Sequence, residues 1–159
     1  MKLLYIAMLC ACAGYAQAPL DADRPVDAVA SLEKPAIAPG GNGKLKVALK
    51  IMEGGHANAN VTADPNLIPT SFTPKPVKGI VWGPAVYPDT QKVTEWYAAD
   101  PMQVFVDGAV IEVPFTVEAG SPAGPVTLTG VLQAQVCDHE QCYPPRRVTV
   151  SVVVKIEGK

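Results

Sequence analysis

The sequence has no excess of positive charge and no basic patch. It carries 13 Lys and Arg residues against 15 Asp and Glu residues, a formal net charge of −2 that becomes −3 when Lys2 is removed with the leader described below. The charge balance therefore argues against nucleic-acid binding. No apolar run after residue 18 reaches the roughly 18 residues that a membrane helix needs, so we expect no membrane span. No internal repeat is present, and the length of 159 residues suits a single domain.

Cysteine is scarce, and only two of the four cysteines lie beyond the first 18 residues. Residues 1–18 combine a positive start, an apolar run and small residues, which is typical of a secretory signal peptide cleaved after Ala16 or Ala18. Leu9 to Cys12 also loosely resembles a lipobox, so an outer-membrane lipoprotein acylated at Cys12 is the alternative. We expect a periplasmic or secreted product, whose remaining cysteines work in an oxidising compartment.

Alternating apolar and polar residues predict an all-β fold. The clearest alternation covers residues 44–52, 125–137 and 147–156, and it predicts strands with one buried face. The last two segments flank the two remaining cysteines and are expected to pair antiparallel. Seven or so short strands, regular turns and almost no helical pattern predict a β-sandwich. Such a domain is large enough to bury a core without a covalent crosslink.

Other segments are less regular. Residues 19–43 are rich in Pro, Ala and Gly without a period, so we expect a linker or loose arm there, with the folded domain spanning 44–159. Residues 91–102 are expected to form a long loop with room for one helical turn. The Asp107-Gly108 dipeptide favours a tight hairpin turn between two extended pieces.

Cys137 and Cys142 are separated by four polar residues, Asp138 to Gln141. On a straight strand, residues five apart lie about 17 Å from each other, whereas a disulfide needs its Cα atoms roughly 4.4–6.8 Å apart. The chain must therefore fold back between the cysteines if they pair. The intervening residues are polar enough for an exposed loop, and the prolines that follow start the return arm rigid and extended.

The residues alone leave three interpretations of this pair. A structural disulfide is the commonest fate of two cysteines in an exported protein, although so small a ring adds only about 2 kcal/mol of stability. Reversible thiol–disulfide exchange is the second, because a partner thiolate can reach an exposed small ring. The third is a zinc or copper(I) site built from Cys137, His139 and Cys142 with His56. Its spacing matches no familiar zinc pattern, and we expect neither a metal ion nor a cofactor.

Two stretches of the sequence carry a resemblance to a known family. Residues 135–145, QVCDHEQCYPP, lie between two strand-like segments rich in Val and Thr. They look like the signature of the N-terminal periplasmic domain of the protein-disulfide reductase DsbD family. Residues 54–60 and 64–71, GGHANAN and DPNLIPTS, resemble a second stretch of the same family. The likeness covers roughly Gly40 to Lys159.

The resemblance implies an immunoglobulin-like β-sandwich with a redox-active cysteine pair. Cys142 would exchange with thioredoxin-like or DsbD-type partners, and Cys137 would resolve the mixed disulfide. An aromatic residue of the loop 94–97 would cover the pair, with an ordinary core aromatic as the alternative for Trp96. His56 would line the site, with a solvated loop residue as its alternative. The residues expected to cover or line the site are Trp96, Tyr97, His56, Asn58, His139 and Tyr143.

The sequence departs from the family in two respects. Best-known members have five residues between the cysteines, and this chain has four. The membrane-embedded electron carrier and the thioredoxin-like domain of the family are missing, so we expect electrons to arrive from a separate protein. The expected function is a protein-disulfide reductase-like component of an electron-transfer relay. The alternative is a non-catalytic interaction module with a structural disulfide.

Overall fold

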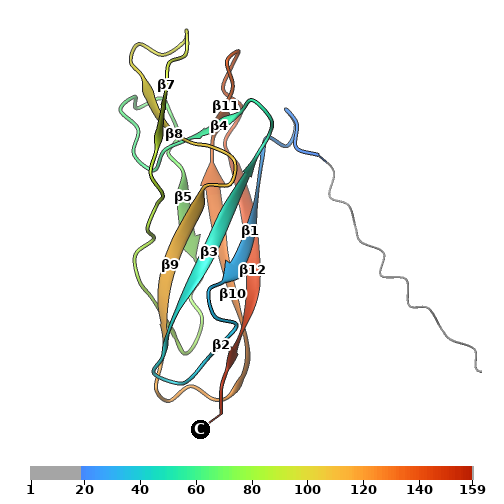
Figure 1. Ribbon diagram of the computed structural model, residues 1–159, viewed down its shortest axis with the longest axis vertical. Helices are drawn as coiled ribbons and strands as arrows, with labels where there is room; N and C mark the ends of the chain where they lie inside the picture. The colour runs from blue at the N-terminus through green and yellow to red at the C-terminus, as the bar shows by residue number, and fades with distance from the viewer. Residues whose placement is uncertain (1–18, 159) are drawn as a thin grey trace, which may run out of the picture.

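The computed structural model describes residues 19–158, which form an all-β, immunoglobulin-like sandwich (Figure 1). This part of the chain contains twelve strands and no helix, hence no helix that could cross a membrane. The strands are β1 (Val26–Leu32), β2 (Ala36–Ile37), β3 (Asn42–Ile51), β4 (His56–Asn58), β5 (Ser71–Pro74), β6 (Ile80–Trp82), β7 (Gln91–Val93), β8 (Met102–Phe105), β9 (Val110–Val117), β10 (Gly124–Ala134), β11 (Val136–Cys137) and β12 (Arg146–Ile156). They exceed the seven or so expected because several are pairings of only two or three residues. The predicted signal peptide and the lipobox alternative at Cys12 lie outside the described residues.

The strands form three four-stranded sheets. Their orders are β1-β3-β9-β6, β2-β12-β10-β5 and β11-β4-β8-β7. The first two are the layers of the sandwich, and the third lies at the end of the molecule away from the C-terminus (Figure 1). The cysteine motif belongs to this third sheet, through β11. The site is therefore built at one end of a rigid two-layer body.

The core lies between the two large sheets and confirms the predicted strands. In β3, Leu45, Val47 and Leu49 are buried, and Leu128 and Leu132 of β10 are buried in the opposite layer. Burial of each such side chain contributes about 1.5–3 kcal/mol. β10 and β12 pair antiparallel along their whole length, as expected. This long hairpin carries the cysteine loop at its tip.

The prediction of a loose arm over residues 19–43 is wrong. β1 pairs with β3 along its whole length, and Val26 at its start is only 1% exposed. β2 adds a short parallel pairing to the end of β12. The strand is hard to recognise in the sequence because two of its inward positions hold alanines, Ala28 and Ala30, which pack against the core without a strong apolar signal.

Two other local predictions are right only in part. A turn forms at Asp107-Gly108, with Gly108 at a φ of 82°, but β8 and β9 on either side belong to different sheets and make no hairpin. The turn binds β3 instead, because the Gly108 N–H donates to the Leu49 carbonyl at 3.0 Å and Asp107 Oδ1 accepts the Ile51 N–H at 2.9 Å. Residues 91–102 begin with β7, which pairs with β8. Residues 94–101 form the expected loop, with one hydrogen-bonded turn in which the Ala98 N–H donates to the Glu95 carbonyl at 3.1 Å.

Candidate functional site

Cys137 and Cys142 form a disulfide at the tip of the β10–β12 hairpin. Their Cα atoms lie 3.9 Å apart, slightly closer than the usual range for a disulfide, and the two residues also pair as an isolated antiparallel bridge. The chain therefore folds back between them, as the spacing requires for pairing. Cys137 is completely buried, whereas Cys142 is only partly buried. The two sulfur-bearing residues thus differ in their access to solvent.

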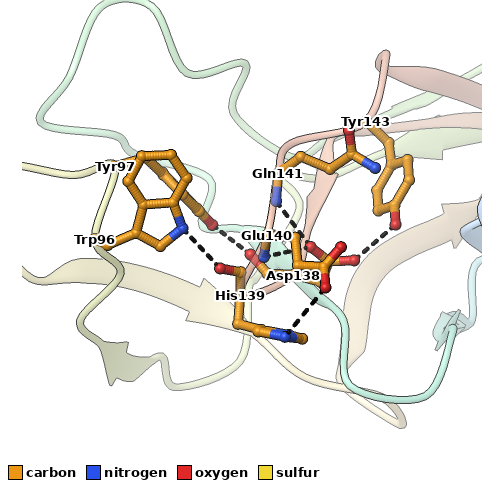
Figure 2. A network of polar contacts seen from close by, with 7 residues as sticks. All are labelled: Trp96, Tyr97, Asp138, His139, Glu140, Gln141 and Tyr143. Atoms are coloured by element: carbon orange, nitrogen blue, oxygen red, sulfur yellow. Dashed lines mark hydrogen bonds and ion pairs between the residues drawn. The ribbon is translucent and has the colours of Figure 1, made fainter.

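Asp138 holds the loop between the cysteines in a tight turn. Its backbone N–H donates to the Gln141 carbonyl at 2.9 Å, and its Oδ1 accepts the N–H groups of Glu140 and Gln141 at 2.8 and 2.9 Å. Its Oδ2 accepts the Tyr143 hydroxyl at 2.6 Å (Figure 2). This last hydrogen bond is the main reason why the pKa of the Asp138 carboxyl lies below its usual value and the pKa of the Tyr143 hydroxyl above its own.

His139, Glu140 and Gln141 are exposed, as expected for this loop, but the expectation is wrong for Asp138, which is 9% exposed. The aspartate itself is a sequence signal for a tight turn at this place. Aspartate often accepts the N–H groups two and three residues ahead and so starts a turn. Asp138 does this with Glu140 and Gln141, the two residues before Cys142.

The loop after β7 lies over the cysteine loop (Figure 2). Trp96 Nε1 donates to the His139 carbonyl at 2.9 Å, and the Tyr97 hydroxyl donates to the Asp138 carbonyl at 2.8 Å. Trp96 is 79% exposed, so the core-aromatic alternative is wrong. Burial, helped by Glu95 and Asp138, raises the pKa of Tyr97 to about 12, which keeps its hydroxyl protonated as a donor. Tyr97 also lines a groove of about 300 Å³, together with residues 61–64 and 98–103.

His56 lies directly opposite Cys137 in the pairing of β4 with β11. It is 5% exposed, so the alternative of a solvated loop residue is wrong. Burial lowers the pKa of its imidazole, while Glu95 and Asp138 act in the opposite direction. At neutral pH the ring is therefore uncharged.

Asn58 is linked to the cysteine loop through Gln135, which alternation along residues 125–137 would place on the outer face of its strand. Asn58 Nδ2 donates to Gln135 Oε1 at 3.0 Å and to the Ile68 carbonyl at 3.1 Å. Gln135 Nε2 in turn donates to the Tyr143 carbonyl at 3.3 Å. Nothing in the sequence marks Gln135, because outward-facing strand residues are usually solvated.

His139 differs from the other expected site residues. Its side chain is 80% exposed, with Nε2 3.6 Å from Glu140 Oε1, and it reaches Trp96 only through its backbone carbonyl. The structure thus brings together the disulfide, His56, Trp96, Tyr97 and Tyr143 and leaves the His139 ring in solvent. Within residues 19–158, no group of three or more His, Cys, Asp or Glu side chains is placed to hold a metal ion.

Comparison with family models finds no match for the sequence, and comparison with curated proteins finds none either. Similar solved structures exist. The N-terminal periplasmic domain of ScsB from Proteus mirabilis is 14% identical with a TM-score of 0.50, over 77% of this chain and 44% of that chain. This chain thus spans less than half the length of the ScsB structure.

Two further structures come from Neisseria meningitidis. The reduced DsbD N-terminal domain is 15% identical with a TM-score of 0.47, over 87% of this chain and 95% of that one. The complex of the DsbD and PilB N-terminal domains matches with 17% identity and a TM-score of 0.47, over 91% of each chain. At such identities a likeness bears on the fold alone, and the ScsB match shows that this chain shares the fold of that domain.

Proposed function

We propose that this protein relays reducing equivalents by thiol–disulfide exchange through a reversible Cys137–Cys142 disulfide. The observation that carries the proposal is the unequal burial of the two cysteines. Cys142 is partly accessible at the tip of a hairpin, whereas Cys137 is completely buried. An incoming thiolate can therefore reach one sulfur of the bond and not the other, which is the asymmetry that ordered exchange requires.

The exchange has two halves. A thiolate of the reduced donor attacks Cys142 Sγ, the Cys137–Cys142 bond breaks, and Cys137 leaves as a thiolate that takes up a proton. The donor's second thiolate then attacks its own sulfur in the mixed disulfide and releases Cys142, so that two electrons have passed to this protein. In the second half, Cys142 attacks an oxidised acceptor and Cys137 closes the bond again, which releases the acceptor as a dithiol.

The loop 94–97 is suited to cover and uncover Cys142. Trp96 and Tyr97 hold it over the cysteine loop by one side-chain hydrogen bond each, to the His139 and Asp138 carbonyls. A hydrogen bond of this kind contributes about 0.5–1.5 kcal/mol net. Breaking these two hydrogen bonds therefore costs little, and Tyr97 borders a groove that leaves space next to the loop. Movement of this loop would widen the access of a partner's thiolate to the partly buried Cys142.

The partners that fit this chemistry are thioredoxin-like or DsbD-type redox proteins, which present a cysteine pair of their own. The proposed location is the periplasm or the secreted fraction, with an outer-membrane lipoprotein anchored at Cys12 as the alternative. In either place a disulfide can form and persist. The protein would act as one component of a reductase system and receive its electrons from another protein.

Trapping a mixed disulfide tests the proposal. The Cys137→Ala variant keeps Cys142 and should form a covalent adduct with a thioredoxin-like protein that lacks its own resolving cysteine. The matched Cys142→Ala variant keeps only the buried Cys137 and should form little or none. Absence of an adduct with Cys137→Ala would overturn the relay and favour the interaction module. A reduction potential below about −300 mV would do the same, because it marks a structural disulfide.

A further inference from the structure

A buried histidine lies beside the buried cysteine. His56 and Cys137 are directly opposite in the antiparallel pairing of β4 with β11. Such residues project from the same face of the sheet, with Cβ atoms about 4.5–5.5 Å apart. His56 is 5% exposed and Cys137 is fully buried, so little water reaches the space between them.

The imidazole of His56 has an unused nitrogen. Within the described part of the chain, Nε2 is buried and has no hydrogen-bond partner. A buried polar atom without a hydrogen-bond partner destabilises the protein, because its interaction with water is lost and not replaced. In the oxidised protein Cys137 cannot satisfy this nitrogen, because the disulfide sulfur has no proton to donate. Reduction creates a thiol on Cys137 that can donate to it.

The charged groups around His56 favour a proton-accepting role. Glu95, from the loop after β7, and Asp138, from the cysteine loop, are the acids that act on the ring. The strands next to β4 add no charge, because β8 and β11 carry no ionisable side chain apart from Cys137. The ring is neutral at rest because it is buried, and the two carboxylates would stabilise the imidazolium that forms when it takes up a proton.

We propose that His56 is the proton acceptor for the Cys137 thiol when this thiol closes the disulfide. The inference rests on the proposed thiol–disulfide exchange and adds to it the group that generates the second nucleophile. A buried thiol has little tendency to ionise without a base. His56 faces Cys137, so it can take the proton where bulk water cannot.

The step balances as follows with glutathione disulfide as the oxidant. The Cys142 thiolate attacks it, forms a Cys142–glutathione disulfide and releases one glutathione thiolate. Cys137 then transfers its proton to His56 Nε2 while its sulfur bonds to Cys142 Sγ, and the second glutathione leaves with the electron pair of the broken S–S bond. The dithiol is oxidised by two electrons, glutathione disulfide is reduced by two, and the imidazolium releases its proton to the leaving thiolate or to water.

The lifetime of the glutathione adduct is the direct measurement. Reduced full-length protein is mixed with glutathione disulfide, quenched with acid and followed by mass spectrometry. In His56→Gln, we expect the Cys142–glutathione adduct to accumulate and to resolve about 10²-fold more slowly than in the wild type. The matched control is His139→Gln, since His56 and His139 are the two histidines of the chain, and it should resolve at the wild-type rate. Equal rates in all three proteins would overturn the inference.

The pH profile separates a base from a structural residue. In the wild type, the resolution rate should rise with pH through the His56 pKa, which lies below the usual value of about 6.5. In His56→Gln this rise should be absent, and the rate should increase only at higher pH, where the buried Cys137 thiol itself ionises. A variant with the same profile shape as the wild type and a uniformly lower rate would count against proton transfer.

A measurement on the unmodified protein covers the case in which His56→Gln fails to fold. NMR titration of the His56 ring should give different Nε2 shifts and pKa values in the oxidised and reduced states, because only the reduced state supplies a donor. Identical values in the two states would overturn the inference. Neither the glutathione assay nor the NMR titration uses a protein partner. A missing adduct with thioredoxin-like proteins would therefore overturn the relay, whereas the role of His56 is tested separately by these two measurements.

Discussion

At the scale of single residues, Asp138 organises the candidate site more than any other side chain. Its carboxylate accepts the Tyr143 hydroxyl and two backbone N–H groups of the loop. Its carbonyl accepts the Tyr97 hydroxyl, so the same residue also anchors the covering loop. Because these bonds favour the charged carboxylate, the shape of the loop depends on the ionisation of Asp138.

Asp138→Asn should lower the free energy of unfolding by about 1.5–3 kcal/mol at pH 7, because hydrogen bonds to a charged acceptor are lost. The folded-state pKa of Asp138 lies below its unfolded value of about 3.9. The stabilisation is therefore complete above that value and disappears as the pH falls through the folded-state pKa. Urea unfolding of wild type and variant between pH 2 and 7 measures this.

The matched control for Asp138 is Asp64→Asn. Asp64 accepts the Asn66 N–H in a similar but exposed turn that is not part of the cysteine loop. Its replacement should change the free energy of unfolding by less than about 0.5 kcal/mol. A difference between wild type and Asp138→Asn that stays constant down to pH 2 would show that the carboxylate charge is not what stabilises the loop.

At the scale of elements, three segments from separate parts of the sequence meet at the site. β11 continues the β10 hairpin arm and carries Cys137, β4 follows β3 and carries His56, and the loop after β7 brings Trp96 and Tyr97. The third sheet holds these three pieces in register at the end of the sandwich. The first sheet is joined to the third sheet through β3, which leads into β4. β3 in turn pairs with β1.

Val26→Ala tests whether β1 is an integral strand. Val26 is 1% exposed, so removing its two methyl groups should lower the free energy of unfolding by about 1–2.5 kcal/mol. Val29→Ala is the matched control on the same strand, because Val29 is 48% exposed and should change stability by less than about 0.5 kcal/mol. Urea unfolding measures both. Equal and small effects would mean that residues 26–32 form the loose arm after all.

At the scale of the whole molecule, the disulfide lies outside the main core. The core residues of β3, β9, β10 and β12 pack between the two large sheets, whereas the Cys137–Cys142 bond closes a ring of local sequence at one end. Chain-entropy reasoning assigns so small a ring only about 2 kcal/mol. A bond of this kind can open without dissolving the body that presents it.

Reduction should therefore leave the sandwich folded. We expect the far-ultraviolet circular dichroism of the reduced protein to match that of the oxidised protein. The Tm should fall by about 4–8 °C, from a loss of about 2 kcal/mol at 2–4 °C per kcal/mol. Cys137→Ala/Cys142→Ala should behave like the reduced wild type. Unfolding on reduction would identify the bond as a structural crosslink and would contradict a relay.

The sequence alone determined the β-sandwich and its long hairpin. Alternation over residues 44–52, 125–137 and 147–156 identifies the buried faces of β3, β10 and β12, because a strand buries every second residue whatever its neighbours are. It also determined that Cys137 and Cys142 could pair only in a bend. These properties follow from local spacing.

Only the tertiary structure decided what surrounds the cysteines. The burial of His56 depends on which strands flank β4. The position of Trp96 depends on a contact with the cysteine loop, where its partner His139 is 43 residues away in sequence. Asp107-Gly108 looks like a hairpin turn but joins two sheets, and alanine-rich β1 looks like a linker until β3 lies beside it. Such outcomes arise from non-local pairing and shared burial, which no single stretch of sequence encodes.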